Sequence, residues 1–392
     1  MKEYINPNYP DISFLREKAK KRIPRFAFDY LDGGCNAEMN LKRNTDDIRN
    51  ILLRPYYLRE IREANLKTEL FGHVYDAPFG MAPIGLQGLM WPKATEILAK
   101  AAFDYNVPFT LSTVATASVE KVAEITEGRA WFQLYHPAEK DLRNDLLKRV
   151  EQSGIEVLVV LCDVPSFGYR SKEIKNGLAI PPKLTLNNLI QIGLHPNWAL
   201  QTLFAGQPSF KTLEPYIPKG MSLKHLGQFM NKTFDGHLDM ERLGEIRDRW
   251  KGKMVLKGVA SPEDAQKCLD LGLDGIIVSN HGGRQLDHGE SSVAALQAIS
   301  EEFRGKFPIM MDSGIRTGPD IASTLAAGAD FTFLGRSFMY GVAALGSKGG
   351  NHTISLLKKQ LYQVMDQLGC EDVYSLRERR VNPKEKQLLP GL

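Results

Sequence analysis

The amino-acid sequence predicts an α/β fold, a (β/α)8 barrel of the TIM type, and three observations support this prediction. Short apolar segments alternate with amphipathic segments from about residue 77 onward, and such alternation is typical of a parallel sheet. The apolar segments number eight, which is the strand count of a closed barrel. No Gly-x-Gly-x-x-Gly motif follows any of them, which argues against the competing architecture, an open doubly wound sheet.

Each expected strand is a short apolar run that ends in small or polar residues. Val157–Leu161, for example, is apolar throughout, which is typical of a strand covered on both faces. In chain order, the expected strands are Pro78–Pro83, Val107–Ser112, Ala130–Tyr135, Glu156–Asp163, Met254–Lys257, Gly275–Ser279, Pro308–Asp312 and Phe331–Gly335.

The segments between the strands have helical periodicity, and several begin with residues that start helices. Ser118 precedes Val-Glu-Lys, and Ser261 precedes Pro262, a residue favoured in the first turn. The expected helices include Lys93–Tyr105, Ser118–Glu127, Glu139–Ser153, Pro262–Leu271 and Ser291–Arg304.

Two segments interrupt this alternation. Residues 1–76 precede the first strand and are expected to form a cover of helices with a short strand-and-turn region across one barrel end. Residues 176–236 form a long insertion between the fourth strand and its helix. We therefore interpret 1–392 as a single domain whose barrel occupies 77–392.

The insertion is apolar and weakly basic. It has five lysines against Glu214 and Asp235, and its apolar side chains include Leu184, Leu189, Ile190, Ile192, Trp198, Leu200, Leu203 and Phe204. Loops of this length without regular structure are uncommon unless they are functional or disordered. Two interpretations stay open: a partly mobile insertion, or a patch that lies on a membrane surface.

The composition is that of a soluble globular protein. The chain has 392 residues, 43% of them hydrophobic, and a net charge of +4 with scattered Lys and Arg, so no nucleic-acid partner is expected. No apolar run approaches the roughly 18 residues of a membrane span, and the first residues lack the apolar core of a signal peptide. The four cysteines form no Cys-x-x-Cys pair. We therefore expect no metal site, no disulfide and a cytoplasmic location.

Polar or small residues end every expected strand, and in a (β/α)8 barrel these ends form the active face. The last two strands are followed by glycine-rich turns that each carry an arginine, Asp312–Gly318 and Leu334–Arg336. Glycines let backbone N–H groups approach a phosphate, and barrels often bind phosphate after strands seven and eight. The two turns together predict a phosphorylated cofactor or substrate.

The segment Ser279–Asp287 holds the most reactive groups. His281 is the only histidine at a strand end, and Arg284 follows it by three residues. A guanidinium can hold a carboxylate while the imidazole removes a proton beside it. Asp163, at the end of the fourth strand, is suited to orient and charge-stabilise the imidazole.

This segment closely resembles the FMN-dependent α-hydroxy-acid dehydrogenase/oxidase family, whose members include glycolate oxidase, L-lactate dehydrogenase and (S)-mandelate dehydrogenase. The resemblance covers roughly residues 10–370 in order. Its further motifs are Pro24-Arg25-Phe26-Ala27-Phe28-Asp29-Tyr30, Trp131-Phe132-Gln133-Leu134-Tyr135, Lys257-Gly258-Val259, Asp312-Ser313-Gly314-Ile315-Arg316 and Gly335-Arg336. The family's fold is an FMN-binding (β/α)8 barrel, in agreement with the strand count.

The resemblance implies the roles of individual residues. His281 matches the active-site base, and the full catalytic set is His281, Asp163, Lys257 and Tyr135. The residues implied to bind the substrate are Tyr30, Tyr135, Arg170, His281 and Arg284. The residues implied to bind FMN are Pro83, Ile84, Gly85, Ser112, Gln133, Tyr135, Lys257, Ser279, Asp312, Ser313, Gly314, Arg316, Gly335 and Arg336.

The implied activity is FMN-dependent oxidation of an L-2-hydroxy acid to the 2-oxo acid, with electrons passed to a quinone. Gly85 favours a dehydrogenase because glycolate oxidase has Ala there, and Val114 replaces a Trp, which leaves a roomier pocket. Leu161 stands where many members have a flavin-binding Thr. Segment His195–Ala199 is similar to bacterial lactate dehydrogenase, whereas Gly168–Arg170 is similar to mandelate dehydrogenase, so the substrate stays open.

Three further activities are compatible with such a barrel. They are an oxidase that uses oxygen and makes H2O2, an FMN barrel that catalyses a non-redox isomerisation, and a barrel that has lost catalysis and only binds. The histidine takes its proton from the hydroxyl in a hydride mechanism or from Cα in a carbanion mechanism. The family also implies a homotetramer, and the insertion raises the possibility of peripheral contact with the cytoplasmic face of the inner membrane.

Overall fold

A computed structural model describes residues 4–58, 60, 63–178, 185–218, 233–234 and 237–381. Its centre is an eight-stranded sheet of parallel neighbours in the order β3-β10-β9-β8-β7-β6-β5-β4. An isolated parallel bridge from Met81 to Phe109 joins the two outer strands, so the sheet closes on itself. The predicted (β/α)8 barrel is confirmed.

All eight expected strands are present, each within or close to its predicted range. They are β3 (Phe79–Met81), β4 (Thr110–Ser112), β5 (Trp131–Leu134), β6 (Val157–Leu161), β7 (Lys253–Val259), β8 (Gly275–Val278), β9 (Ile309–Met311) and β10 (Phe331–Leu334). Nearly all their residues are buried, because helices cover the outer face and side chains such as Trp131, Val159, Val255 and Phe333 fill the barrel interior.

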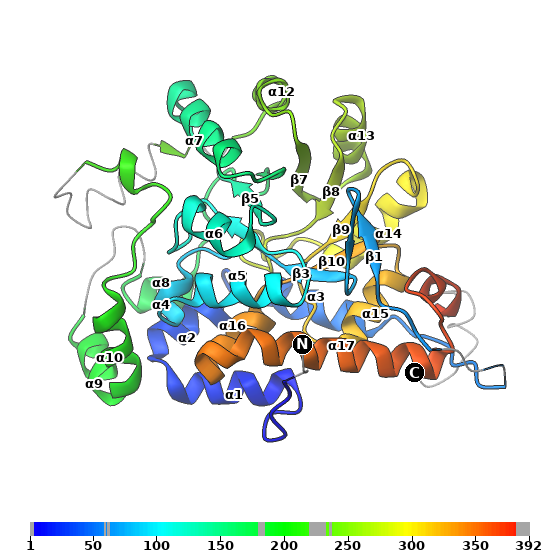
Figure 1. The fold of residues 1–392 in the computed structure, drawn as a ribbon, viewed down its shortest axis with the longest axis horizontal. Helices are drawn as coiled ribbons and strands as arrows, with labels where there is room; N and C mark the ends of the chain where they lie inside the picture. Colours follow the sequence, from blue (N-terminus) through cyan, green and yellow to red (C-terminus); the bar gives the residue numbers. More distant parts are fainter. Residues whose placement is uncertain are drawn as a thin grey trace.

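The helices surround the barrel as predicted (Figure 1). Ser118 and Ser261 cap α6 and α13 by accepting hydrogen bonds from the N–H groups of Lys121 and Asp264. The surrounding helices are α4 (Gln87–Met90), α5 (Ala94–Asp104), α6 (Val119–Thr126), α7 (Lys140–Gln152), α8 (Ser171–Lys175), α12 (Met240–Arg249), α13 (Pro262–Asp270), α14 (Ser292–Phe303), α15 (Gly318–Ala326), α16 (Arg336–Leu345) and α17 (Gly349–Leu368). Three short 3-10 helices are η1 (Glu214–Tyr216), η2 (Gly346–Lys348) and η3 (Tyr374–Arg379).

The N-terminal residues cover both ends of the barrel. Helices α1 (Ile12–Arg22), α2 (Arg25–Asp32) and α3 (Met39–Arg49) precede an antiparallel hairpin of β1 (Thr68–Leu70) and β2 (His73–Tyr75). The hairpin closes the end where the strands begin, because Tyr75 packs on Phe331 and accepts a hydrogen bond from the Trp131 indole. Helices α2 and α3 lie at the opposite end, where the strands finish.

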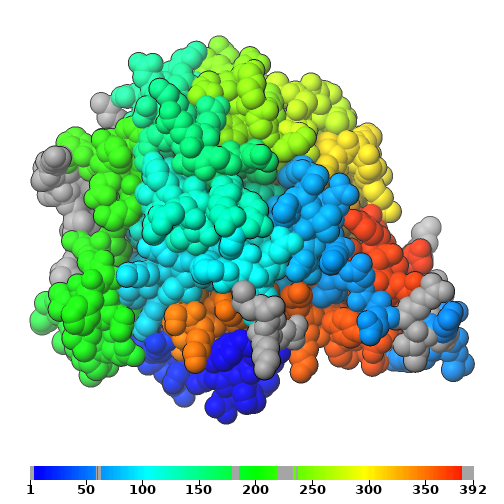
Figure 2. Space-filling model, in the orientation of Figure 1, coloured from blue at the N-terminus to red at the C-terminus, as the bar shows by residue number. Residues whose placement is uncertain are grey.

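The insertion after β6 contains regular structure that its length alone did not predict. Helices α9 (Leu186–Leu194) and α10 (Pro196–Ala205) form a hairpin that projects from one side of the molecule (Figures 1 and 2, green). Thr185 caps α9, and Pro196 occupies the first turn of α10. Within the insertion, Leu184, Asp235 and every lysine except Lys211 lie outside the described residues.

Candidate active site

A large cavity of about 950 Å³ opens at the ends of the barrel strands. This volume lies near the upper limit for small-molecule sites, roughly 300–1,000 Å³. Its walls come from the ends of β3, β4, β5, β7, β9 and β10, from α2, and from the segment between β6 and α12. The cavity lies on the face where the enzymes of this fold have their active sites.

His281 follows β8 and faces Asp163, which follows β6. Its Nδ1 atom lies 3.2 Å from the Asp163 carboxylate, and no described protein group binds its Nε2 atom. The His281 backbone has a φ of 58°, an uncommon value outside glycine, and such strain is concentrated at functional positions. The Nδ1 atom of His281 therefore faces the Asp163 carboxylate, and its Nε2 atom is available to a ligand.

The charges around this pair set its protonation state. Burial lowers the pKa of His281, and Asp163 only partly opposes that effect. Burial also opposes ionisation of Asp163, but His281 and Lys257 outweigh it and hold the pKa of the carboxyl below its usual value. At neutral pH the imidazole is thus a free base beside an ionised carboxylate, the arrangement that general-base catalysis requires.

Lys257 is a buried cation that lines the cavity. It forms a 3.0 Å ion pair with Asp312 and donates a 2.8 Å hydrogen bond to the Ser279 hydroxyl. Burial alone would lower its pKa, but Asp312 and Asp163 outweigh burial and raise it. Lys257 therefore stays charged and can stabilise negative charge that develops in the cavity.

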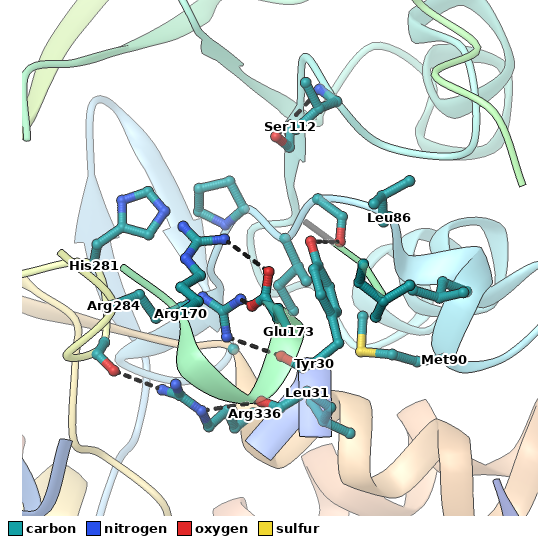
Figure 3. A pocket seen from close by; sticks show the side chains of 18 of the residues that line it. Tyr30, Leu31, Leu86, Met90, Ser112, Arg170, Glu173, His281, Arg284 and Arg336 are labelled. Atoms are coloured by element: carbon teal, nitrogen blue, oxygen red, sulfur yellow. Dashed lines mark hydrogen bonds and ion pairs between the residues drawn. The ribbon is translucent and has the colours of Figure 1, made fainter. Parts of the chain in front are cut away.

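Two arginines converge on one side of the cavity with a glutamate between them (Figure 3). Arg284 donates to the backbone oxygens of Tyr30 and Gly33 and forms an ion pair with Glu173. Arg170 lies 3.6 Å from the same glutamate, and its buried Nε atom has no hydrogen-bond partner in the described structure. Two guanidinium groups against one carboxylate leave one positive charge to bind an anionic ligand.

Two tyrosines line the same region. Tyr30, from α2, lies under the Arg284 guanidinium and donates a 3.4 Å hydrogen bond to the backbone oxygen of Gly85. Tyr135 follows β5 and packs edge-on against Phe234. Burial raises the pKa of Tyr135 to about 12 and also raises the pKa of Tyr30. Both hydroxyls therefore stay protonated and can donate hydrogen bonds to a ligand.

A neighbouring part of the cavity is suited to bind a phosphate. Arg316 and Arg336 line it, and within the described ranges neither forms a salt bridge. Burial, reinforced by Arg316 and Arg284, lowers the pKa of Arg336 to about 9, so an anion here would relieve an uncompensated charge. Gly335 is the N-cap residue of α16, and the N-terminus of this helix adds a favourable dipole. A Cβ on Gly314 would lie 2.5 Å from the backbone oxygen of Asn44, so only glycine fits that turn.

The structure brings the sequence-predicted site residues together. Of the predicted residues, all but two line the cavity. The exceptions, Asp163 and Ser279, lie one layer behind it, where Asp163 contacts His281 and Ser279 contacts Lys257. The predicted phosphate turns and the predicted carboxylate-binding arginines line one cavity, where Arg284 and Arg336 donate to the same backbone oxygen, that of Gly33.

Sequence reasoning missed several residues of the site. Glu173 pairs with both arginines, and its spacing of three residues from Arg170 on a short helix was the available signal. Gln285 joins the loops after β6 and β8 by donating to the backbone oxygens of Asp163 and Ser166. Phe210, from the insertion, lines the cavity beside Tyr135, but no local pattern distinguished it from ordinary apolar residues.

The barrel, its phosphate site and its base–arginine arrangement define the class: a flavin-type barrel oxidoreductase. Comparison with known proteins agrees. The family model described as FMN-dependent dehydrogenase matches residues 19–383, and the chain belongs to this family.

Individual relatives support the same assignment. The L-lactate dehydrogenase of Vibrio parahaemolyticus is 38% identical over 362 residues, which cover 92% of this chain and 95% of the relative. That of Acinetobacter baylyi is 37% identical over 93% of this chain and 94% of the relative.

Two solved structures are also similar. The structure of the monotopic membrane protein (S)-mandelate dehydrogenase matches with a TM-score of 0.90 and 33% identity, over 96% of this chain and all of that one. A mandelate oxidase matches with a TM-score of 0.82 and 29% identity, over 95% and 98%. The predicted cofactor, FMN, is thus confirmed, and the phosphate region of the cavity has the chemistry to hold it.

Proposed function

We propose that the protein oxidises an L-2-hydroxy acid to the 2-oxo acid and passes the electrons to a quinone. The observation that carries this proposal is the shared cavity of Arg170, Arg284 and the His281–Asp163 pair. A site that combines a carboxylate anchor with a neutral base suits a 2-hydroxy acid, whose carboxylate and hydroxyl lie on adjacent carbons. The similar L-lactate and (S)-mandelate dehydrogenases agree with this substrate class.

The residues divide the chemistry between them. The arginines fix the substrate carboxylate and so restrict the orientation of its Cα atom. His281 removes a proton, from the hydroxyl or from Cα, and Asp163 stabilises the imidazolium that results. FMN, when bound, would accept the two electrons that the substrate loses. Lys257 lines the cavity as a fixed positive charge, which stabilises negative charge that develops beside it during the reaction.

The pocket for the substrate side chain is apolar and aromatic. Val114, Phe210 and Phe234 line the cavity near Tyr135, and they belong to one apolar cluster. An apolar wall favours an aromatic or branched substrate side chain over the single methyl group of lactate, because the larger side chain buries more apolar surface. We therefore expect mandelate-like acids to react at least as well as lactate.

Anaerobic flavin reduction tests the core proposal. The purified holoprotein is mixed with L-lactate, L-mandelate and longer L-2-hydroxy acids, and the flavin absorbance is followed in a stopped-flow instrument. We expect rapid bleaching with at least one L-acid and none with the D-acids. If no acid in the panel bleaches the flavin, the proposed reaction is wrong.

The acceptor is tested separately. The reduced enzyme is mixed with oxygen or with a short-chain quinone, and the rate of flavin reoxidation is compared at equal acceptor concentration. We expect the quinone to react much faster. A much faster reaction with oxygen would make the protein an oxidase that produces H2O2.

We also propose that the α9–α10 hairpin lies on a membrane surface. Its outward side chains include Leu186, Leu194, Leu203 and Phe204, each between 72% and 84% exposed, an apolar surface larger than water-facing helices normally carry. Among the described residues no helix is both long and apolar enough to cross a membrane. The similarity to the monotopic membrane protein (S)-mandelate dehydrogenase supports a surface attachment of this kind.

A vesicle assay tests this attachment. We expect the protein to sediment with lipid vesicles, and the double variant Leu203→Ser with Phe204→Ser to remain in the supernatant. The variant should keep flavin reduction, because neither side chain lines the cavity. Equal sedimentation of both proteins would contradict the proposal.

The remaining proposals concern organisation and location. We propose a single domain that assembles as a homotetramer on the cytoplasmic face of the inner membrane. The exposed tip Tyr56–Leu58, whose Leu58 is 98% exposed, is a candidate contact between copies. Light scattering of detergent-solubilised protein gives the oligomeric state, and a monomeric mass would contradict the tetramer.

A further inference from the structure

Part of the cavity lies away from His281, and the residues that line it there are mostly apolar. Beyond Tyr30, away from His281, Leu86 and Met90 line the cavity (Figure 3). The wall continues along Leu89, Leu178, Ile192 and Trp198. We call the space bounded by Leu89, Met90, Leu178, Ile192 and Trp198 the apolar arm.

Part of the wall of this arm is the α9–α10 hairpin itself. Ile192 lies on α9 and Trp198 on α10, and both line the cavity from the inner side of the hairpin. The outer side of the same two helices carries the exposed leucines and Phe204. One element thus contributes its inner face to the cavity and its outer face to the proposed membrane contact.

The hairpin is fixed firmly enough to hold a defined wall. The buried Trp198 indole donates a 3.1 Å hydrogen bond to the Met90 backbone and packs edge-on against Phe26. Asn188 donates to the Asn176 backbone oxygen, and the Gln191 side chain accepts from the Phe26 N–H. The side-chain polar groups of Trp198, Asn188 and Gln191 are therefore paired within the protein.

We infer that the apolar arm binds the electron acceptor, a quinone with an alkyl or isoprenoid tail, which enters from the lipid beside the hairpin. The inference rests on the proposed function. The tail matches the apolar wall, and the inner end of the arm opens into the space that holds the catalytic groups and the flavin-binding residues. We expect a lipid-soluble acceptor to approach from this side, because α9 and α10 contribute both to the arm and to the proposed membrane contact.

The overall reaction is balanced in electrons and protons. The hydroxy acid loses two electrons and two protons and becomes the 2-oxo acid. The quinone gains two electrons and two protons and becomes the quinol. Substrate and acceptor then use different regions of one cavity, the arginine side for the acid and the apolar arm for the quinone.

Filling the arm tests the inference. The variant Ile192→Trp places an indole in the arm, and Asn187→Trp, on the exposed side of the same helix, is the matched control. Both are assayed in detergent solution, so that membrane attachment does not matter, with a decyl-tailed benzoquinone and with ferricyanide as a small water-soluble acceptor. We expect Ile192→Trp to raise the KM for the quinone about tenfold or more relative to the control, with a change of less than about twofold for ferricyanide.

A binding measurement gives a readout that does not depend on turnover. The decyl-tailed benzoquinone is titrated into each oxidised holoprotein, and quenching of flavin fluorescence gives the Kd. We expect a Kd about tenfold weaker in Ile192→Trp than in Asn187→Trp. If Ile192→Trp does not fold, Leu178→Gln makes the arm polar without adding volume, and the same weakening is expected.

The outcomes separate this inference from the proposed function. If wild-type flavin is not reduced by any L-2-hydroxy acid, the proposed function fails, whereas the quinone titration still tests the arm. Unchanged quinone KM and Kd in the arm variants would overturn the inference. If only long-chain hydroxy acids lose kcat/KM in Ile192→Trp while quinone kinetics stay normal, the arm binds a substrate tail and the inference is wrong.

Discussion

At the scale of single residues, His281 is governed by two opposing effects. Burial favours the neutral imidazole, and Asp163, 3.2 Å away, favours the protonated one. The net result is a pKa below the ordinary value of about 6.5. The base is therefore already neutral at pH 7 but can still accept a proton that Asp163 then stabilises.

Replacing the base gives the first prediction. His281→Gln should lower the rate of anaerobic flavin reduction by about 10²- to 10⁴-fold, because no other group takes up the proton. The FMN content should remain normal, since the phosphate contacts lie elsewhere in the cavity. Stopped-flow absorbance measures the rate, and the flavin-to-protein ratio is the control. A variant that keeps its rate would remove His281 from this role.

The second prediction concerns pH. The rate constant kcat/KM should rise with pH as His281 loses its proton, with an apparent pKa below about 6.5. Asp163→Asn removes the charge that raises the pKa of His281, so the acid limb should move to lower pH while the plateau rate falls roughly a hundredfold. A limb that moves to higher pH would contradict this account of the pair.

Glu173 leads to the third prediction. It is buried between Arg170 and Arg284, so Glu173→Gln leaves two partly buried cations without a carboxylate and should cost about 3 kcal/mol of folding stability. A 2-oxo acid product should restore part of that loss by supplying a carboxylate. Thermal unfolding with and without the product measures both effects, and Glu173→Asp, which keeps the charge, is the control. If the product stabilised the variant and the wild type equally, Glu173 would not be the group that compensates the charges of Arg170 and Arg284.

Glu173 also shows what the sequence could not reveal at this scale. Arg170 is three residues away, but Arg284 belongs to another strand end more than a hundred positions later, and only the closed barrel brings them together. His281, Asp163 and Lys257 were predictable, because each lies within three residues of the end of an apolar strand and barrel strand ends share one face.

At the scale of elements, the strands were predictable because burial on both faces removes polar residues from them. The α9–α10 hairpin was not predicted as helical, although Thr185 and Pro196 are ordinary helix-start residues. The obstacle was its hydrophobicity, since apolar residues on both faces give no clear division between a core side and a water side. If the outer face of the hairpin contacts lipid, as we propose, then apolar residues on both faces of these helices are expected.

The register of β7 leads to the fourth prediction. The strand shifts register between Lys257 and Val259, and Gly258 there has a φ of 106°. A Cβ on Gly258 would lie 2.5 Å from the Asp163 Cβ, so Gly258→Ala should displace the carboxylate from His281 and cost about 1–3 kcal/mol. The rate of flavin reduction should also fall, because the displaced Asp163 carboxylate no longer orients His281.

A glycine elsewhere provides the control for that experiment. Gly244 lies on α12, where a Cβ would meet only Leu271 at 3.9 Å. Gly244→Ala should therefore be neutral or slightly stabilising. Denaturant unfolding and the pH profile of kcat/KM separate the two variants, and equal behaviour would show that the register shift at Gly258 does not position Asp163.

At the scale of the whole molecule, one arginine connects the barrel to its N-terminal cover. Arg336, at the start of α16, donates to the backbone oxygens of Leu31 and Gly33 in the cover and of Gly282 after β8. Burial and the neighbouring Arg316 disfavour its charge. A phosphate dianion at this position would favour that charge and so strengthen the connection between α2 and the barrel.

The last prediction follows from this connection. FMN at about a hundred times its Kd should stabilise the apoprotein by about 2.7 kcal/mol, and it should slow amide hydrogen exchange in α2 and in the loop after β8. Riboflavin, which has the same ring but no phosphate, is the matched control at equal saturation. It should protect the barrel strand ends and leave α2 exchanging as in the apoprotein, because it brings no anion to Arg336. Equal protection of α2 by both ligands would mean that the ring alone holds the cover, and that the charge at Arg336 is not what joins the two parts of the molecule.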